Sequence, residues 1–420
     1  MSEPATASGF PRLTYLRIKN YRALRDVELR DLTPLTVFIG PNSSGKSTVL
    51  DALAFLAEAV SGNLQQAWEK RNRFAGMRTR GSDGPIEFEV KITDDFRGLT
   101  LRYILAIGEI NQRPFIVNEE LGNSKELLFI SFYQAENNTT LASIPSMAET
   151  HEHQIFYNNQ PAWRKTGEYQ FDGWKESVVP LLTGLALPFA QELTVLKSTL
   201  TSYRYIHLTD DHLKGYSDAG PREKLSANGD NLPNVLYYLH TKHPEALARI
   251  TAQLRRWVPG LADVVTEITS DERLLLRFRD APFEKPLPAQ YMSDGTMRLA
   301  ALLTLLYEPN ATGLLGLEEP ENELHPRLLP RLAEELIKAT ETRQLLIATH
   351  SPALLDALEP EQVWILHRGE DGYTQATRIA DIPEVVAMVE EGSKLGYLWA
   401  RNFFDVGDPL APRSSQSAQE

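Results

Sequence analysis

The chain has 420 residues, 42% of them hydrophobic and 24% charged, which is an ordinary composition for a globular protein. It has no cysteine, no apolar run of membrane-spanning length and no apolar segment after Met1, which argues against disulfides, thiolate metal sites, a membrane helix and a secretory signal. We therefore expect a cytoplasmic protein without membrane contact, and the formal net charge of −13 leaves only a local patch for any contact with nucleic acid.

Strands and a helix alternate in the N-terminal part. Leu13–Ile18 alternates apolar and polar residues as a half-buried strand does, and Val27–Leu29 is a second short strand. Leu35–Ile39 is almost entirely apolar and runs directly into Gly40, which is typical of a buried strand in an α/β sheet. After the glycine loop, apolar residues recur at helical spacing at Val49, Leu53, Leu56 and Val60.

The middle of the chain has a different pattern. We expect strands over 86–92 and 101–107, a helical segment over 178–200 interrupted by Pro180 and Pro188, helices over 232–239 and 245–257, and a hairpin of 264–268 with 274–279. Residues 122–176 are polar and show no clear period.

Alternation returns after Ser293. We expect helices over 297–307, 327–339 and 353–358 and strands over 313–317, 344–348 and 363–367, with Pro330 tolerated only in a first helical turn. The pattern predicts an α/β fold in which residues 12–60 and 286–405 form one domain, 61–285 form an inserted lobe that also supplies some strands to that domain, and 406–420 form a disordered tail.

A glycine loop follows the apolar strand. Residues 40–47 match the pattern G-x-x-x-x-G-K-[S/T] between a predicted strand and a predicted helix. In such a loop the backbone amides and the helix N-terminus bind phosphates, Lys46 contacts the β- and γ-phosphates, and the Ser47 hydroxyl is a ligand of Mg²⁺. The sequence therefore predicts a site for ATP and Mg²⁺ whose triphosphate-binding residues are Gly40, Pro41, Asn42, Ser43, Ser44, Gly45, Lys46, Ser47 and Thr48.

Two carboxylates follow a second apolar strand. Glu318 and Glu319 come directly after residues 314–317, a strand that we expect to lie next to the glycine-loop strand. There Glu318 would support the Mg²⁺ ion, and Glu319 would orient and deprotonate the attacking water. An acidic loop on its own is more often a solvated surface, so this interpretation depends on the glycine loop.

Three further segments resemble a known family. Glu318–Pro326 resembles the Walker B and D-loop segment of ABC ATPases, closest to the RecF-like and OLD-family (overcoming lysogenization defect) ATPases. Met292–Thr296 resembles the ABC signature, and Ala348–Pro352 resembles the H-loop. With the glycine loop as Walker A, the motifs stand in the order of that family.

The resemblance implies a P-loop ABC-type ATPase head with an inserted α+β lobe. It implies that His350 contacts the γ-phosphate and acts in catalysis with Glu319 and Lys46. It also implies that Ser293 and the amide of Gly295 bind the γ-phosphate of ATP held by a second copy of the chain, so that the sites are completed in a homodimer or a higher oligomer. Ser293 equally fits an ordinary helix N-cap, and the two interpretations are compatible.

The long gap between motifs distinguishes the branches of the family. More than half of the chain separates Ser47 from Ser293, which does not suit a transporter motor, and the gap lacks the long heptad runs of a coiled-coil clamp. A compact insertion, as in RecF-like and OLD-like ATPases, fits. OLD proteins carry a TOPRIM nuclease domain, but no suitable acidic cluster follows His350, so we expect ATPase activity with a separate effector protein.

Two functions remain open from the sequence. The first is an ATPase of DNA repair or anti-phage defence, and the second is an ATP-controlled scaffold that binds and restrains a protein partner without acting on nucleic acid. A basic stretch between Lys70 and Arg80, near Trp68 and Phe74, is either a nucleic-acid contact or a solvated loop, and the acidic net charge favours the loop. Gln65 is a weak candidate for the Q-loop residue of the family.

Overall fold

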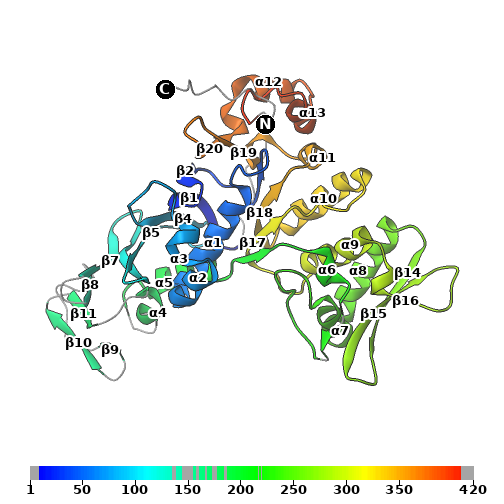
Figure 1. Ribbon diagram of the computed structural model, residues 1–420, viewed down its shortest axis with the longest axis horizontal. Helices are drawn as coiled ribbons and strands as arrows, with labels where there is room; N and C mark the ends of the chain where they lie inside the picture. Colours follow the sequence, from blue (N-terminus) through cyan, green and yellow to red (C-terminus); the bar gives the residue numbers. More distant parts are fainter. Residues whose placement is uncertain are drawn as a thin grey trace, which may run out of the picture.

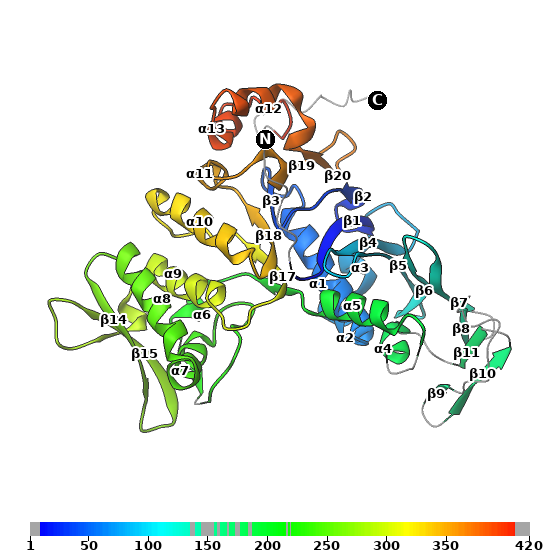
Figure 2. The same ribbon diagram turned by 180° about the vertical axis from the view of Figure 1, so that it is seen from behind.

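A computed structural model describes residues 9–134, 139–143, 155–157, 160–165, 168–172, 177–183, 187–215, 217–218 and 220–407. Figures 1 and 2 show a central sheet with an antiparallel sheet to one side of it and a lobe of helices and short strands to the other. The fold is α/β, as the sequence predicts. Most of the predicted disordered tail (406–420) lies outside the described residues.

The antiparallel sheet begins with the hairpin of β1 (Arg12–Tyr21) and β2 (Leu24–Leu29). From β1 it continues through β4 (Ile86–Asp94), β5 (Leu99–Ile110), β6 (Arg113–Asn123), β7 (Leu127–Gln134), β8 (Thr139–Ser143), β11 (Glu168–Asp172), β10 (Gln160–Lys165) and β9 (Ile155–Tyr157). The predicted strands at 86–92 and 101–107 are β4 and β5. The strands β7 to β11 lie within residues 122–176, where the sequence shows no clear period.

The central sheet carries the predicted motifs. Its strand order is β12 (Arg204–Ile206), β17 (Gly313–Glu318), β18 (Arg343–Thr349), β3 (Leu35–Ile39), β19 (Val363–Arg368) and β20 (Thr374–Arg378). All neighbours are parallel except β19 and β20. The expectation that the acidic strand lies next to the glycine-loop strand is wrong, because β18 lies between β17 and β3; the order of strands in a parallel sheet is set by crossovers that local sequence does not encode.

Each face of the central sheet packs against a separate core. The pattern of β3 explains this, because Phe38 points into one core while Val37 and Ile39 point into the other. The first core is shared with the antiparallel sheet and includes buried residues of α1 (Lys46–Val60), α2 (Leu64–Lys70), α3 (Arg73–Met77), α4 (Val179–Leu182) and α5 (Ala190–Thr201). The second lies on the opposite face, under α10 (Leu329–Ala339), α11 (Pro352–Leu355), α12 (Pro383–Glu390) and α13 (Leu395–Ala400).

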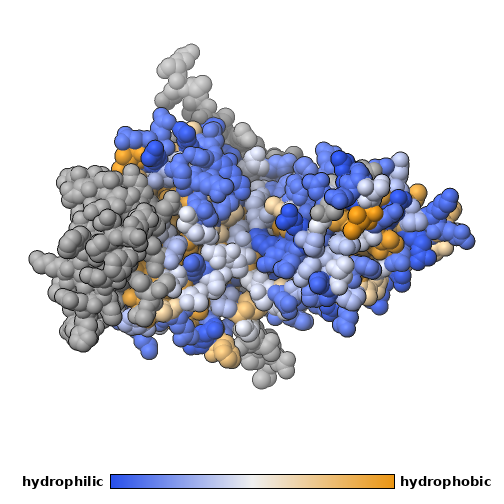
Figure 3. Space-filling view, turned by 90° about the horizontal axis from the view of Figure 1, so that it is seen from below, coloured by the Kyte–Doolittle hydropathy of each residue, from blue (hydrophilic) through white to orange (hydrophobic). Residues whose placement is uncertain are grey.

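The lobe joins this second core. It contains α6 (Asp210–Leu213), α7 (Leu232–Lys242), α8 (Pro244–Trp257) and α9 (Asp294–Leu306), with the strands β13 (Ser217–Asp218), β14 (Leu261–Ile268), β15 (Arg273–Asp280) and β16 (Leu287–Pro288). Exposed apolar side chains occur here at Val265, Ile268, Phe283 and Leu287, and Figure 3 shows hydrophobic surface at this end of the molecule.

The predicted helices are mostly in place. The segment 178–200 is divided into α4 and α5, Pro330 lies in the first turn of α10, and the helix expected at 353–358 is the shorter α11. Residues 61–285 supply β4–β11 to the antiparallel sheet and β12 to the central sheet before they enter the lobe, so the division at 60 and 285 stays a proposal about domains.

Gln344 connects the two sheets. Its side chain is fully buried at the start of β18, where Oε1 accepts from the Leu13 amide at 2.8 Å and Nε2 donates to the carbonyls of Leu13 and Thr33 at 2.8 and 3.0 Å. One side-chain amide thus satisfies three backbone groups, two of which are the amide and the carbonyl of Leu13 in β1.

We predict that Gln344→Leu lowers the free energy of unfolding by about 1–3 kcal/mol, because a side chain of similar size leaves these backbone groups unpaired. Chemical denaturation measures the change. Gln66→Leu, at an exposed position of α2, is the control and should shift stability by less than about 0.5 kcal/mol. Equal stability of the two variants would contradict the assignment.

Candidate functional site

The glycine loop turns sharply between β3 and α1, and two glycines make the turn sterically feasible. Gly45 has φ 106°, and a Cβ there would lie 2.6 Å from the Thr374 hydroxyl. A Cβ on Gly40 would lie 1.9 Å from the Leu366 carbonyl oxygen. The loop therefore lies directly on the β19–β20 hairpin, and only glycine fits at these two positions.

The hairpin also holds the loop by hydrogen bonds. Arg368 Nε donates to the Ser43 carbonyl and Thr374 Oγ1 donates to the Ser44 carbonyl, each at 2.8 Å. The Ser44 hydroxyl is buried without a hydrogen-bond partner among the described residues. A rigid loop with an unsatisfied hydroxyl at a helix N-terminus suits the binding of phosphate oxygens.

Lys46 lies along the loop. Its Nζ donates to the carbonyls of Gly40 at 2.9 Å and Pro41 at 3.0 Å. Burial lowers the pKa of Lys46 to about 8, although Glu319, Glu318 and Glu321 act in the opposite direction. Phosphate oxygens would be stronger partners than these carbonyls, so the ammonium group is suited to exchange them for a triphosphate.

Glu318 is the last residue of β17, and it contacts α1, the helix that follows the glycine loop. The Ser47 hydroxyl donates to its Oε1, while the Tyr205 hydroxyl and His207 Nδ1 (2.8 Å) donate to Oε2. Burial alone would raise the pKa of Glu318, but the hydrogen bonds from His207, Ser47 and Tyr205 outweigh it and lower the pKa to about 2. A serine hydroxyl in contact with an ionised carboxylate is the all-oxygen donor set that Mg²⁺ prefers, so these two residues fit the ion.

Glu319 adopts an unusual backbone conformation next to it. Its φ of 44° lies in the left-handed region, and its amide donates to the Ala348 carbonyl at 2.8 Å. The carboxylate is held by His350 Nε2 at 3.1 Å and by Asn322 Nδ2 at 2.6 Å. Burial, followed by the nearby charge of Lys46, lowers the pKa of His350.

Glu321 is a further residue of the site, and the sequence pattern does not reveal it. It is buried, and its Oε1 accepts from the Thr349 hydroxyl and from the His350 amide at 3.0 Å. It thereby fixes the segment that carries His350. Its position three residues after Glu318 offered no signal, because an acidic run does not reveal which carboxylate turns inward.

These elements surround a cavity of about 640 Å³. Residues 42–48 line it together with Glu319 and His350, whereas Gly40, Pro41 and Glu318 do not line it and act through the contacts described above. The remaining lining residues were not predicted from the sequence: Arg22, Ala23, Ala75, Gly76, Arg78, Arg80, Arg368, Gly372 and Tyr373.

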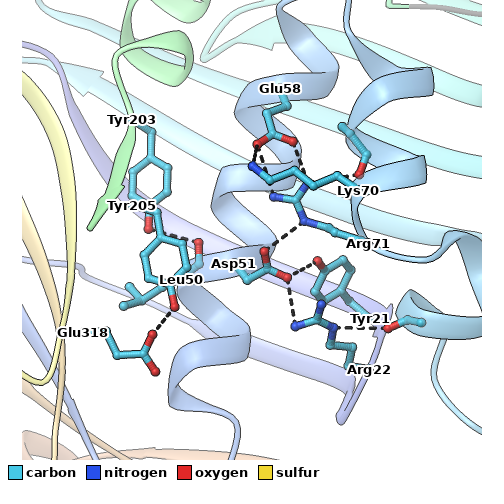
Figure 4. Close-up of polar contacts among 12 residues, drawn as sticks. Tyr21, Arg22, Leu50, Asp51, Glu58, Lys70, Arg71, Tyr203, Tyr205 and Glu318 are labelled. Atoms are coloured by element: carbon cyan, nitrogen blue, oxygen red, sulfur yellow. Dashed lines mark hydrogen bonds and ion pairs between the residues drawn. The ribbon is translucent and has the colours of Figure 1, made fainter. Parts of the chain in front are cut away.

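The basic stretch between Lys70 and Arg80 does not form one continuous surface, and its contact with nucleic acid stays a prediction. Arg71 is buried and pairs with Asp51 at 2.9 Å and Glu58 at 2.5 Å, as Figure 4 shows. Trp68 is fully buried with Phe74 packed edge-on against it, so this indole cannot stack on a nucleic-acid base. Arg78 and Arg80 line the cavity instead, which places positive charge beside the predicted phosphate site.

Gln65 does not line this cavity. Its Nε2 donates to Glu69 Oε1 at 2.6 Å, and it borders a second, polar cavity of about 450 Å³ with Arg73 and Arg113. The geometry gives no support to a Q-loop role for this residue.

Ser293 and Gly295 lie away from the chain's own cavity. Ser293 is the N-cap of α9, where its hydroxyl accepts from the Thr296 amide at 3.3 Å, and neither residue lines the cavity. A Cβ on Gly295 would lie 2.5 Å from the Glu323 carbonyl oxygen, so the start of α9 packs against the segment after β17. Their action on ATP of a second copy stays a prediction.

Comparisons with known proteins identify ATPase domains over most of the chain. Residues 12–178 match the family described as "AAA ATPase domain", and residues 191–356 match the family described as "AAA domain, putative AbiEii toxin, Type IV TA system". A crystal structure of an SMC head bound to the C-winged helix domain of ScpA has a TM-score of 0.52 at 13% identity, and the match covers 87% of this chain and 97% of that one. This likeness shows the fold of an ABC-type head.

Two curated relatives are also similar. "Retron Ec83 probable ATPase" of Escherichia coli is 21% identical over 435 residues, which span 88% of this chain and 74% of the relative. The OLD nuclease of Thermus scotoductus is 30% identical over 97 residues, 23% of this chain and 18% of the nuclease.

Fold and site together define a P-loop ATPase with an ABC-type head. The chain is an AAA-type ATPase, and the resemblance to the OLD-like and RecF-like branch that its motifs indicated is confirmed. Among the described helices, none has both the length and the apolar character needed to cross a bilayer.

We predict that Glu321→Leu lowers ATP turnover by about tenfold or more, because the Thr349–His350 segment loses its buried acceptor and small displacements of reacting groups are costly. Glu321→Gln keeps an acceptor oxygen and should retain most of the activity. Steady-state phosphate release measures both variants, and equal activity of the leucine variant and the wild type would contradict the positioning role.

Proposed function

We propose that two copies of this chain bind ATP between them and that hydrolysis lets them separate. The observation that carries the proposal is that Glu319 and His350 line the same cavity as the phosphate loop, while the N-terminus of α9 with Ser293 lies outside it. A second copy would supply the Ser293 hydroxyl and the Gly295 amide to this cavity, and the positive end of α9 would favour the γ-phosphate.

The residues divide the chemistry among them. Mg²⁺, when bound, neutralises phosphate charge, and Ser47 with Glu318 would hold it. Lys46 and the loop amides bind the triphosphate. Glu319, fixed between His350 and Asn322, orients a water molecule and accepts its proton, and His350 contacts the γ-phosphate. The lowered pKa of His350 favours the neutral ring, whose single N–H can donate to Glu319, as Nε2 does here, or to the γ-phosphate.

We further propose a role in anti-phage defence or DNA repair with a separate effector protein. The similarity to a retron ATPase and to an OLD nuclease supports this role, and the exposed apolar side chains of the lobe support a protein contact. Dimer formation, a higher oligomer, the effector and a cytoplasmic location are all part of this proposal.

A scaffold that restrains a protein partner without nucleic acid is the second candidate. It is favoured by the net charge of −13 and by the burial of Trp68 and Arg71. Because they are buried, the Trp68 indole cannot stack on a base and the Arg71 guanidinium cannot contact a phosphate of a nucleic acid. Both candidates use the same ATP-dependent assembly and differ in what stimulates hydrolysis.

We predict that Glu319→Gln lowers ATP turnover by about 10²–10⁴-fold, because the proton acceptor is lost, while ATP binding is retained. With Mg²⁺ and ATP the variant should accumulate as a dimer, measured as mass by light scattering. Glu334→Gln, on the exposed face of α10, is the matched control and should behave as the wild type. Wild-type turnover in Glu319→Gln would exclude the assigned role.

Stimulation of the wild type by DNA or RNA would favour repair or defence; turnover indifferent to both would favour the scaffold.

A mixing experiment tests completion of the site by a second copy. Lys46→Ala lacks a working phosphate loop and Ser293→Arg blocks the partner's γ-phosphate, so each variant alone should be inactive. Mixed, they form heterodimers with one intact composite site, and part of the ATP turnover should return. Lys46→Ala mixed with Ser47→Ala is the control, because both defects lie in the same half of the site. No recovery in the first mixture, although heterodimers form, would contradict the proposal.

A further inference from the structure

An edge strand of the central sheet reaches the proposed metal-binding carboxylate. β12 contains only Arg204–Ile206, pairs in parallel with β17, and brings two side chains to the end of that neighbour. The Tyr205 hydroxyl and His207 Nδ1 both donate to Glu318 Oε2, and Figure 4 shows the tyrosine directed at the carboxylate. Neither residue belongs to a motif that the sequence reveals.

The two donors fix how the carboxylate is turned. Because Oε2 is held by Tyr205 and His207, Oε1 is the oxygen left to face Ser47, whose hydroxyl donates to it. Without them the carboxylate could rotate about its Cγ–Cδ bond and present either oxygen. Hydrogen bonds of this kind around a ligating carboxylate orient it and tune its affinity for the metal.

The donors are themselves held in place. The His207 amide donates to the Ala227 carbonyl at 2.8 Å, and the next carbonyl, that of Leu208, accepts from Arg298 Nη2 at 3.1 Å. Tyr203, two residues before Tyr205 and on the same side of the strand, donates its hydroxyl to the Leu50 carbonyl of α1 at 3.0 Å. The strand thus packs on helix α1, which carries Ser47, and pairs with the strand that carries Glu318.

We propose that Tyr205 and His207 are positioning residues that orient Glu318 for Mg²⁺, so that they set the affinity of the site for the Mg²⁺ of Mg²⁺–ATP without touching the nucleotide. This inference rests on the proposed roles of Ser47 and Glu318. It concerns binding of the ion and therefore has a readout that does not depend on turnover.

The experiment measures binding of a fluorescent ATP analogue while Mg²⁺ is titrated from an EDTA-buffered start. We expect Tyr205→Phe and His207→Leu each to raise the Mg²⁺ concentration at half-maximal tight binding by about 10–100-fold. Binding of the analogue in EDTA should be unchanged in both. His207→Asn, which places an amide donor near the position of Nδ1, should restore most of the Mg²⁺ affinity.

Tyr203→Phe is the matched control. It removes a hydroxyl from the same face of the same strand, but one that bonds to Leu50 and not to Glu318. Shifts in Tyr205→Phe and His207→Leu no larger than that of Tyr203→Phe would overturn the proposal. So would equal losses of binding with and without Mg²⁺, because they would indicate a general structural role.

Ser47→Ala separates this inference from the proposed site. If Ser47→Ala leaves the Mg²⁺ dependence of the wild type intact, the metal site itself is misplaced. If Ser47→Ala abolishes that dependence while the β12 variants match Tyr203→Phe, the metal site stands and only the positioning role fails.

Discussion

The site depends on one constraint, the parallel register of β17, β18 and β3. Ala348 of β18 lies opposite Glu318 of β17, and Thr349 lies opposite Ile39 of β3, so all three strands end at the same edge of the sheet. The chain leaves that edge as the phosphate loop, as the segment of His350 and as the acidic segment after Glu318. The register of the strands therefore brings together segments that lie up to hundreds of residues apart in the sequence. This is the arrangement expected where ligands bind at the carboxyl ends of parallel strands.

Electrostatics then decides what the site can accept. Three carboxylates, those of Glu318, Glu319 and Glu321, act on Lys46, and the first keeps its charge because its hydrogen bonds outweigh burial. A triphosphate brings more negative charge to the same place, so one ammonium group cannot balance it. A divalent cation beside Ser47, together with the guanidinium groups of Arg22, Arg78 and Arg368 that line the cavity, would supply the missing positive charge.

The sequence predicts the parts of this site whose information is local. The phosphate loop, the acidic strand end and the H-loop each follow a strand of clear apolar pattern, and β3 has the predicted bounds. The pattern could not give the strand order, in which β18 lies between β17 and β3. It also could not show that Arg71 pairs with Asp51 and Glu58 or that Arg78 lines the cavity. β12 could not be predicted because a strand of three residues shows no periodic pattern. For the same reason the sequence did not indicate that Tyr205 and His207 lie near the site.

The segment after β12, residues 207 and 208, also connects the site to the lobe by hydrogen bonds. Arg298, on the helix that Ser293 caps, donates to the Leu208 carbonyl at 3.1 Å and to the Glu319 carbonyl at 3.4 Å. Residue 207 is bonded to the lobe through its amide and to Glu318 through its ring. A displacement of α9 relative to β17 must therefore break these bonds or move both carboxylates with it. Because α9 carries the groups proposed to reach a second copy, contact between copies would be mechanically linked to the geometry of hydrolysis within each chain.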